Sequence, residues 1–343
     1  MGGFTLSEEV AGQKETIVPG LLFITAIAIV AYIIGSMYPI IGGAISGILI
    51  GIIINHFFGT KAKFLPGIDF TMKKLLKVGI VLLGFSFSFA DIIAVGKSSI
   101  IIVMISVISG LTFTYYIGRL FGLKGNTALL IGSGTAICGA TAIVTLSPVI
   151  KAKEEELTYA VNTIFAFNVL AILTFPFIAT ALGMSDYHFG IWAGAAIHDT
   201  SSVVAAGYAY SDEAGGVSVV VKLARTLMLI PLVIAVAIYQ SMKAKEAGSI
   251  EGEGRVNILS VFPYFILYFV GVALFNTFVS LPTVIPDTAV SISKFLIVMV
   301  MVSVGLKTDI RKIRQVGYKP LIVGLIASVL ISLISLTLIK WMV

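Results

Sequence analysis

Charged side chains are scarce in this sequence of 343 residues. They make up 12% of it, whereas about 25% is usual in a soluble domain. Hydrophobic residues make up 58%, and the mean hydropathy is +1.07. Several apolar runs reach the roughly 20 residues that cross a hydrocarbon layer about 30 Å thick. This composition excludes a soluble enzyme and predicts an all-α polytopic protein of the lipid bilayer. The runs are continuous rather than alternating, which disfavours a membrane barrel.

Cysteine is nearly absent, because Cys138 is the only one. A single cysteine excludes an intrachain disulfide and a metal site built from several thiolates. The sequence also lacks zinc-ligand spacing, a P-loop and a nucleophile elbow. We therefore expect no ATP-driven pump, no enzyme activity, and no bound cofactor or metal. The net charge of +6 is attributed to cytoplasmic loops rather than to a nucleic-acid partner.

About eleven membrane crossings are expected from the apolar runs that lie between charged and Gly- or Pro-rich segments. The fifth and seventh are poor as continuous helices. Residues 1–18 are expected to form a tail, and residues 19–343 a single transmembrane domain with a candidate division at the charged linker 241–257. The expected crossings lie near residues 19–37, 40–58, 72–95, 98–118, 126–150, 156–182, 188–210, 216–241, 258–279, 288–306 and 320–341.

The distribution of Lys and Arg predicts the orientation. Most of these residues fall in segments that share a side with the N-terminus, which places the N-terminus in the cytoplasm. An odd number of crossings then places the C-terminus outside. Residues 73–84 (KKLLKVGIVLLG) also resemble residues 294–305 (KFLIVMVMVSVG). The two runs are expected to point in opposite directions, as an inverted repeat requires, although apolar sequences match easily by chance.

The segment GSGTAICGATAI (Gly132–Ile143) interrupts the fifth expected crossing with three glycines. Each glycine costs a helix interior about 1 kcal/mol relative to alanine, so this helix is expected to break. Unwound backbone at membrane depth is tolerated only against protein or a water-filled cavity, where half-helix ends can bind ions. Close packing between helices, which small residues also allow, explains the glycines equally well.

The segment GAAIHDTSSVVAAG (Gly194–Gly207) places His198 and Asp199 in the seventh expected crossing. Asp199 is a good N-cap for a helix that starts at Thr200. Ionisable residues at membrane depth indicate function, and the alternative is a loop between two surface helices. The two broken crossings run in the same direction in this topology, whereas the partners of an inverted repeat should be antiparallel.

The segment VKLARTLMLIP (Val221–Pro231) carries Lys222 and Arg225 on one helix face. If the helix starts near Gly216, Arg225 lies about 13 Å along it, close to the middle of the bilayer. Such cations would bind an anion, Arg in bidentate fashion. If the crossing starts at Leu223 instead, both side chains snorkel to the interface.

These three segments, in this order and spacing, resemble the YeiH-like family of bacterial membrane proteins, which are commonly labelled sulfate exporters. The resemblance covers nearly the whole chain. It implies an inverted-repeat secondary-transporter fold, similar to sodium/proton antiporters and bile-acid symporters, with crossed broken helices near the midplane. It also implies that Gly132–Ala142, His198–Ser202, Lys222 and Arg225 gather around one site.

The resulting hypothesis is a secondary active transporter of the bacterial inner membrane, with export as its direction. Its substrate would be a small inorganic or organic anion such as sulfate, another sulfur oxyanion or a sulfonate. His198 and Asp199 would couple transport to H⁺ or Na⁺, because histidine changes charge near neutral pH. The residues predicted to bind the anion are Ser133, Gly134, Thr135, Cys138, Gly139, Thr141, Thr200, Ser201, Lys222 and Arg225.

Three alternatives remain open at this point. A cation/proton antiporter on the same scaffold would use Asp199 as its carrier. A passive channel could be lined by the two broken helices. A membrane-embedded enzyme would need an activated nucleophile, and none is apparent. A homodimer is a further expectation, since dimers are common on this scaffold.

Overall fold

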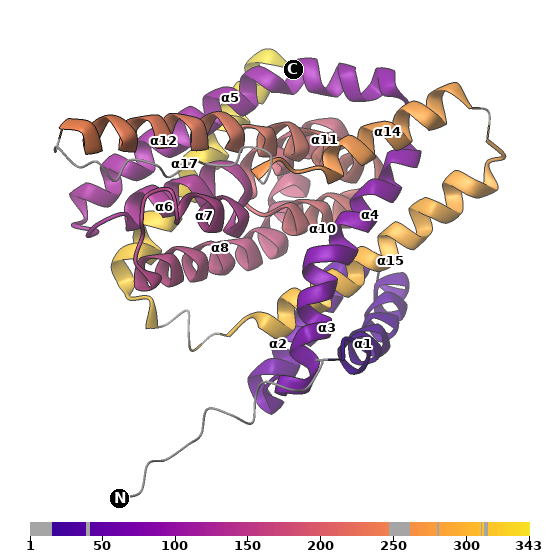
Figure 1. Ribbon diagram of the computed structural model, residues 1–343. Coiled ribbons are helices and arrows are strands. Elements are labelled where there is room, and N and C mark those ends of the chain that lie inside the picture. The colour runs from indigo at the N-terminus through magenta and orange to yellow at the C-terminus, as the bar shows by residue number, and fades with distance from the viewer. Residues whose placement is uncertain (1–15, 39–41, 247–260, 280, 310, 312–314) are drawn as a thin grey trace, which may run out of the picture.

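The computed structural model describes residues 16–38, 42–246, 261–279, 281–309, 311 and 315–343, which form helices and connecting turns without a strand (Figure 1). The expected tail (1–18) and linker (241–257) therefore lie mostly outside the described residues. Six helical segments are long and apolar enough to cross a membrane. These are α1 (Val18–Met37), α5 (Phe89–Leu120), α8 (Glu154–Ala181), Asp212–Met242, α15 (Val284–Lys307) and α17 (Tyr318–Met342).

Shorter helices complete the bundle. The segment Asp212–Met242 consists of α11 (Asp212–Leu227) and α12 (Leu229–Glu246), which meet at Met228. The remaining elements are α2 (Gly42–Phe58), the 3₁₀-helical η1 (Ala62–Phe64), α3 (Leu65–Phe70), the π-helical η2 (Thr71–Leu75), α4 (Leu76–Leu83), the 3₁₀-helical η3 (Gly84–Ser86), α6 (Thr127–Ser133), the π-helical η4 (Gly134–Cys138), α7 (Ala140–Leu146), α9 (Asp186–Ala196), α10 (Thr200–Tyr210) and α14 (Phe265–Phe278).

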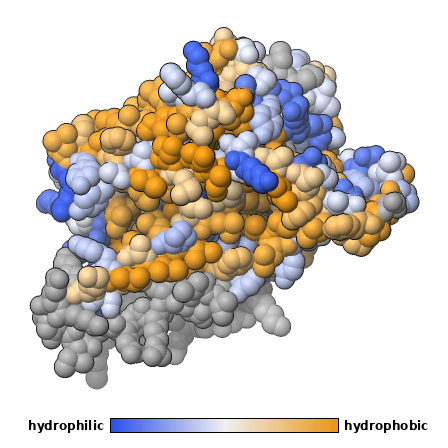
Figure 2. Space-filling model, turned by 90° about the horizontal axis from the view of Figure 1, so that it is seen from above, coloured by the Kyte–Doolittle hydropathy of each residue, from blue (hydrophilic) through white to orange (hydrophobic). Residues whose placement is uncertain are grey.

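The helices form two packed groups. In Figure 1, α1, α2, α3 and α15 lie together, beside a larger group that contains α5 to α12 and α17. A large apolar core holds the larger group together, and two smaller cores join α1, α2 and α15 to one another and to α10. Figure 2 shows hydrophobic residues over most of one face of the molecule, with hydrophilic residues mainly toward its edges. This surface is that of a membrane protein.

The third and fourth expected crossings meet at a different place from the one predicted. The expected boundary lay at residues 95–98, but α5 continues through it. The chain breaks instead at a short 3₁₀ turn, η3 (Gly84–Ser86). Ser88 then starts α5 with a capping box, in which the Asp91 amide donates to Ser88 Oγ (3.1 Å) and the Ser88 amide to Asp91 (3.0 Å). Reciprocal capping satisfies two amides at once, which fixes the start of α5 there.

The fifth expected crossing is a hairpin rather than a broken crossing. Asn126, which precedes α6, donates from Nδ2 to the carbonyl of Ile150, which follows α7 (3.2 Å). Between them, a Cβ on Gly134 would lie 2.8 Å from Cδ1 of Ile143. Residues at equal distances before and after Cys138–Gly139 therefore lie side by side. We call α6, η4 and α7 together hairpin 1.

The seventh expected crossing is also a hairpin, formed by α9 and α10 and here called hairpin 2. The Tyr210 hydroxyl, at the end of α10, donates to the carbonyl of Met184, just before α9 (2.6 Å). The rings of Phe189 and Tyr210 lie 4.2 Å apart, so the first and last turns of the hairpin are in contact.

The helix α11 gives the directions of the two arms of hairpin 2. Gly190 and Gly194 of α9 pack on Val217 and Val221 in the same order, so α9 runs parallel to α11. The helix α10 runs antiparallel to α11. The carbonyl of His198, just before α10, accepts a hydrogen bond from Lys222, whereas Gly207 near the end of α10 packs on Gly215 and Ser218, which come earlier in α11.

The two hairpins enter the bundle from opposite ends. Glu156, at the start of α8, accepts a hydrogen bond from the Asn126 amide beside the base of hairpin 1 (2.9 Å). The other end of α8 leads into hairpin 2, and its 28 residues span about 42 Å between the two bases. We call the end with Asn126 end A and the end with Met184 end B. The prediction that residues 126–150 and 188–210 cross the membrane is thereby corrected: each run returns to the end from which it came. This also removes the conflict in their directions.

Candidate functional site

The tips of the two hairpins meet in the middle of the bundle. A Cβ on Gly139, at the tip of hairpin 1, would lie 3.2 Å from Cβ of Asp199 at the tip of hairpin 2. Gly139 has φ 65° and ψ −135°, a conformation that only glycine adopts readily. A glycine is needed here both for its backbone angles and for the approach of Asp199.

Lys222 joins the two tips from α11. Its ammonium donates to the carbonyls of Ile137 (2.9 Å), Ile197 (2.8 Å) and His198 (2.5 Å). Three acceptors require three N–H donors, so the side chain is a protonated ammonium with every proton used. The first acceptor belongs to hairpin 1 and the other two to hairpin 2, and Lys222 is fully buried.

Arg225, one turn further along α11, also contacts both tips. Its Nε donates to the carbonyl of Ala136 (2.6 Å), Nη1 donates to that of Ile197 (2.9 Å), and Nη2 donates to that of Thr135. A longer contact joins Nη1 to the Gly194 carbonyl (3.5 Å). Like Lys222, Arg225 has no exposed surface.

Both cations therefore bind protein rather than facing an open anion site. The carbonyls belong to the last turns of η4 and α9, or directly follow α9, where a helix carries partial negative charge. The prediction that Lys222 and Arg225 contact an anion directly is corrected in this respect. Of the two alternatives for Arg225, snorkelling at the interface is also wrong, because the side chain is buried at the tips.

Asp199 occupies the start of α10. Its Oδ2 accepts hydrogen bonds from the Ser201 amide (2.9 Å) and the Ser201 hydroxyl. Its own amide donates to Oδ1 of Asn168 on α8 (3.1 Å). The predicted N-cap is thus present, and Asp199 remains partly exposed where its neighbours are buried. Oδ1 carries none of these hydrogen bonds and lies on the side of Gly139.

Several hydroxyls predicted to bind the anion point elsewhere. Ser133 donates to the Leu130 carbonyl (2.9 Å), and Thr135 to the carbonyl of Ile131 (2.9 Å). A hydroxyl has one proton to donate, so these two are corrected as anion donors. Ser201 donates to Asp199.

The other predicted residues lie at or near the tips. Thr141 is exposed beside the tip of hairpin 1, and Thr200 is buried at the start of α10. Cys138 is buried at the tip of hairpin 1, and Gly134 packs against Ile143 and Ile164.

His198 lies behind the tip rather than in the gap. Its Nδ1 is 3.0 Å from the Thr135 carbonyl of hairpin 1, and its Nε2 is 2.7 Å from Oγ of Ser328 on α17. The carbonyl can only accept, which assigns a proton to Nδ1. The ring is buried and ties hairpin 2 to hairpin 1 and α17. It is placed to position the tips.

Two residues of this region were given no site role from sequence. Asn168 accepts the hydrogen bond from the Asp199 amide and so joins α8 to the tip of hairpin 2. Ser328 gave no signal, because serines are frequent in α17 and only the fold brings this one to His198.

Comparison with known proteins gives one family throughout. The family described as conserved hypothetical protein 698 matches residues 19–324. A UPF0324 membrane protein of Streptococcus agalactiae is 38% identical over 333 residues, which covers 95% of this chain and 97% of that protein. One from Clostridium tetani is 35% identical and covers 92% of this chain and 94% of its own. One from Fusobacterium nucleatum is 35% identical, with 94% and 97% covered. The resemblance drawn from the sequence is confirmed.

Proposed function

The chain belongs to the family of conserved hypothetical protein 698, the YeiH-like membrane proteins, and we propose that it is a secondary active transporter of a small anion. The anion would sit at the meeting point of the two hairpin tips, beside Gly139, Thr141 and Asp199. Sulfate, another sulfur oxyanion or a sulfonate has the right charge and size. Export from the cytoplasm remains part of the proposal.

One observation carries this proposal: two buried cations lie behind the tips, against one acidic side chain among the described residues there. Lys222 and Arg225 are fully buried, and Asp199 is partly exposed. Their sum leaves one positive charge in a region of low dielectric constant, where an uncompensated charge is costly. A bound anion would compensate this positive charge, although Lys222 and Arg225 contact the backbone carbonyls of the tips and would not contact the anion itself.

The arrangement of the hairpins supports a transporter. Hairpins that enter from opposite ends and meet at their tips make a site that either end could reach in turn. The sequence echo agrees with an inverted repeat, in which Lys73 and Lys294 occupy matching positions. The helices that carry them run in opposite directions, because Asp69 pairs with Lys307 whereas the later residue Gly79 contacts the earlier residue Ser293. Gly79 of α4 contacts Ser293 of α15 (Ser293 Oγ to Gly79 O, 2.6 Å).

The corrected topology also favours a cytoplasmic location for end A. Because hairpin 1 returns to end A, Lys151 and Lys153 join Arg119 and Lys124 at that end. The excess of Lys and Arg at end A over end B is therefore larger than in the topology expected from sequence. Loops rich in Lys and Arg face the cytoplasm. We infer that end A is cytoplasmic.

The coupling role is assigned to Asp199. It is the ionisable side chain of the tips that keeps some exposure, whereas the nitrogens of His198 contact Thr135 and Ser328. A proton or Na⁺ on Asp199 would change the charge seen by the anion by one unit. A cation antiporter would use the same carboxylate without an anion.

A thermal-shift screen of purified protein separates these functions. A ligand that binds only the folded state raises the melting temperature by mass action. We expect sulfate, thiosulfate or a small sulfonate to raise it, and Thr141→Val to reduce the shift, since it loses a hydroxyl at the tip. Thr174→Val is the matched control, because Thr174 is exposed on α8 and binds the Leu170 carbonyl. Stabilisation by Na⁺ alone, abolished by Asp199→Asn, would replace the anion transporter with a cation antiporter.

A further inference from the structure

A second site lies at end B, away from the hairpin tips. A cavity of about 220 Å³ opens between hairpin 2, the start of α11, and the helices α1, α2 and α15. Its polar lining consists of Tyr32, Ser36, Tyr208, Asp212 and Lys294, and glycines and aliphatic side chains make up the rest. At about 30 Å³ for each water molecule, the volume holds roughly seven waters. A small oxyanion with part of its hydration shell fits, and a long-chain solute does not.

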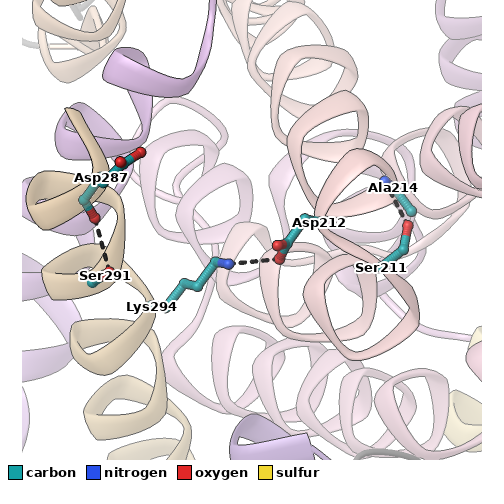
Figure 3. A network of polar contacts seen from close by, with 6 residues as sticks. All are labelled: Ser211, Asp212, Ala214, Asp287, Ser291 and Lys294. Atoms are coloured by element: carbon teal, nitrogen blue, oxygen red, sulfur yellow. Dashed lines mark hydrogen bonds and ion pairs between the residues drawn. The ribbon is translucent and has the colours of Figure 1, made fainter. Parts of the chain in front are cut away.

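Lys294 is the cation among the described residues that line this cavity. Figure 3 shows it reaching from α15 to Asp212 of α11, with 2.6 Å between Nζ and Oδ1. Its ammonium also lies 5.6 Å from the centre of the Tyr208 ring. The side chain of Lys294 is 35% exposed and that of Asp212 is 78% exposed. An ion pair this exposed contributes little to stability, so its partners can exchange.

The charge of the Asp212 carboxylate is stabilised without Lys294. It is the first residue of α11, where the positive end of the helix dipole stabilises a carboxylate. Ser211 caps the same helix, accepting the Ala214 amide at its hydroxyl (3.0 Å), as Figure 3 also shows. If Lys294 turned to another anion, Asp212 would keep the helix terminus and the solvent. Lys294 is therefore the partner that is free to change.

An apolar layer separates the cavity from the hairpin tips. Ala205 of α10 packs in one core with Ile45 and Ile48 of α2 and with Met301 of α15. Tyr208 and Ala209 lie on the cavity side of this layer, and Asp199 lies near the other end of α10, whose 11 residues span about 16 Å. The cavity is therefore distinct from the tip site and is reached from end B.

We propose that this cavity is a second anion site, in which Lys294 releases Asp212 and binds a small oxyanion or sulfonate. Tyr208 and Ser36 also line this volume, but the Ser36 hydroxyl donates to the Ile33 carbonyl (2.7 Å), which leaves Lys294 as the group that would bind the anion. The proposal rests on the proposed transport function only for the destination of the anion, namely the hairpin tips beyond the apolar layer. Binding in the cavity itself needs no transport.

Cysteine labelling measures the charge preference of the cavity directly. Ser36→Cys places a thiol in the lining of the cavity. The parent protein, in which the native Cys138 is buried, gives the background rate of labelling. The protein is labelled with a sulfonate-bearing and with a trimethylammonium-bearing methanethiosulfonate, and the ratio of the two rates is compared between variants. Adding Lys294→Met should slow the anionic reagent and speed the cationic one, each about five-fold, which is the effect of one unit charge at about 4 Å in water, so the anionic-to-cationic ratio should fall about 25-fold. Adding Asp212→Asn should raise the ratio by a similar factor. Inorganic sulfate should protect the thiol when Lys294 is present and fail to protect it in Lys294→Met.

Lys340→Met is the matched control, because Lys340 is an exposed lysine near the C-terminal end of α17 and does not line the cavity. It should leave both the ratio and the protection unchanged. The site is refuted if Lys294→Met leaves the ratio and the sulfate protection as they are in the Ser36→Cys protein, or if Lys340→Met changes them equally. Failure of the transport proposal is separate: it appears as a sulfate-induced rise in melting temperature that Thr141→Val leaves unchanged and Lys294→Met abolishes, while the labelling result stands.

Discussion

Lys222 and Arg225 share one acceptor, the carbonyl oxygen of Ile197, at 2.8 and 2.9 Å. Each also binds a carbonyl of hairpin 1, so two neighbouring cations on α11 hold both tips against each other. The positive charges that an anion would sense are thus fixed by backbone groups and do not move with the ligand. Charge that is already in place needs no reorganisation when the ligand arrives.

Lys222→Met should destabilise the protein strongly. Methionine matches the stem of lysine but leaves the carbonyls of Ile137 and His198 without their donor, and that of Ile197 with Arg225 alone. A buried polar group without a partner costs about 1–3 kcal/mol, so the loss should amount to several kcal/mol. The melting temperature and the urea midpoint in detergent would show it. Lys294→Met removes the same charge from a partly exposed site and should change stability by less than about 1 kcal/mol. Equal effects of the two variants would contradict the structural role of Lys222.

Gly139→Ala should abolish anion binding at the tips. The new methyl would lie 3.2 Å from Cβ of Asp199 and would require a positive φ, so the tips must separate. Gly183→Ala is the control: its φ is 63°, but no atom lies within 4 Å of the added carbon. Gly183→Ala should therefore cost only about 1 kcal/mol of backbone strain and leave anion binding intact. If both variants bind the anion equally, contact between the tips is not required for the site.

The breaks in the hairpins could be predicted from sequence, but their direction could not. Gly139 and the pair His198–Asp199 mark the two tips because glycine and ionisable residues are out of place in an apolar helix. A hairpin and a broken crossing have the same composition, however. What distinguishes them is long-range contact, such as Tyr210 with Met184 and Asn126 with Ile150.

The hydrogen-bond acceptors of Lys222 and Arg225 could not be predicted from sequence either. The spacing of Lys222 and Arg225 correctly indicated one helix face, and both side chains are buried. Their acceptors are backbone carbonyls, which every residue possesses and no sequence pattern marks. The direct anion contact inferred from sequence was wrong for that reason.

Asp199→Asn should strengthen anion binding and remove coupling. Asparagine is as good an N-cap as aspartate, so α10 should keep its start and the stability should change little. The lost negative charge should tighten anion binding about five-fold, the value of one unit charge at about 4 Å in water. Isothermal titration would measure the affinity, and proteoliposomes would measure accumulation. Accumulation driven by a proton or Na⁺ gradient should be lost while exchange of one anion for another continues. Weaker anion binding in Asp199→Asn would exclude the proposed charge relationship.

The two hairpins also make a topological prediction that single cysteines can test. If hairpin 1 returns to end A, Lys124→Cys and Lys151→Cys lie on the same side of the membrane, whereas a broken crossing would place them on opposite sides. If hairpin 2 returns to end B, Asp186→Cys and Asp212→Cys share the other side. All four positions lie outside the apolar core, and the native Cys138 is buried. A membrane-impermeant maleimide applied to intact cells should label the second pair and not the first, because end A is inferred to be cytoplasmic. Labelling of all four after the cells are opened is the control for reactivity. If one member of either pair reacts in intact cells and the other does not, that segment crosses the membrane, and the meeting of two re-entrant tips can no longer be the basis of the site.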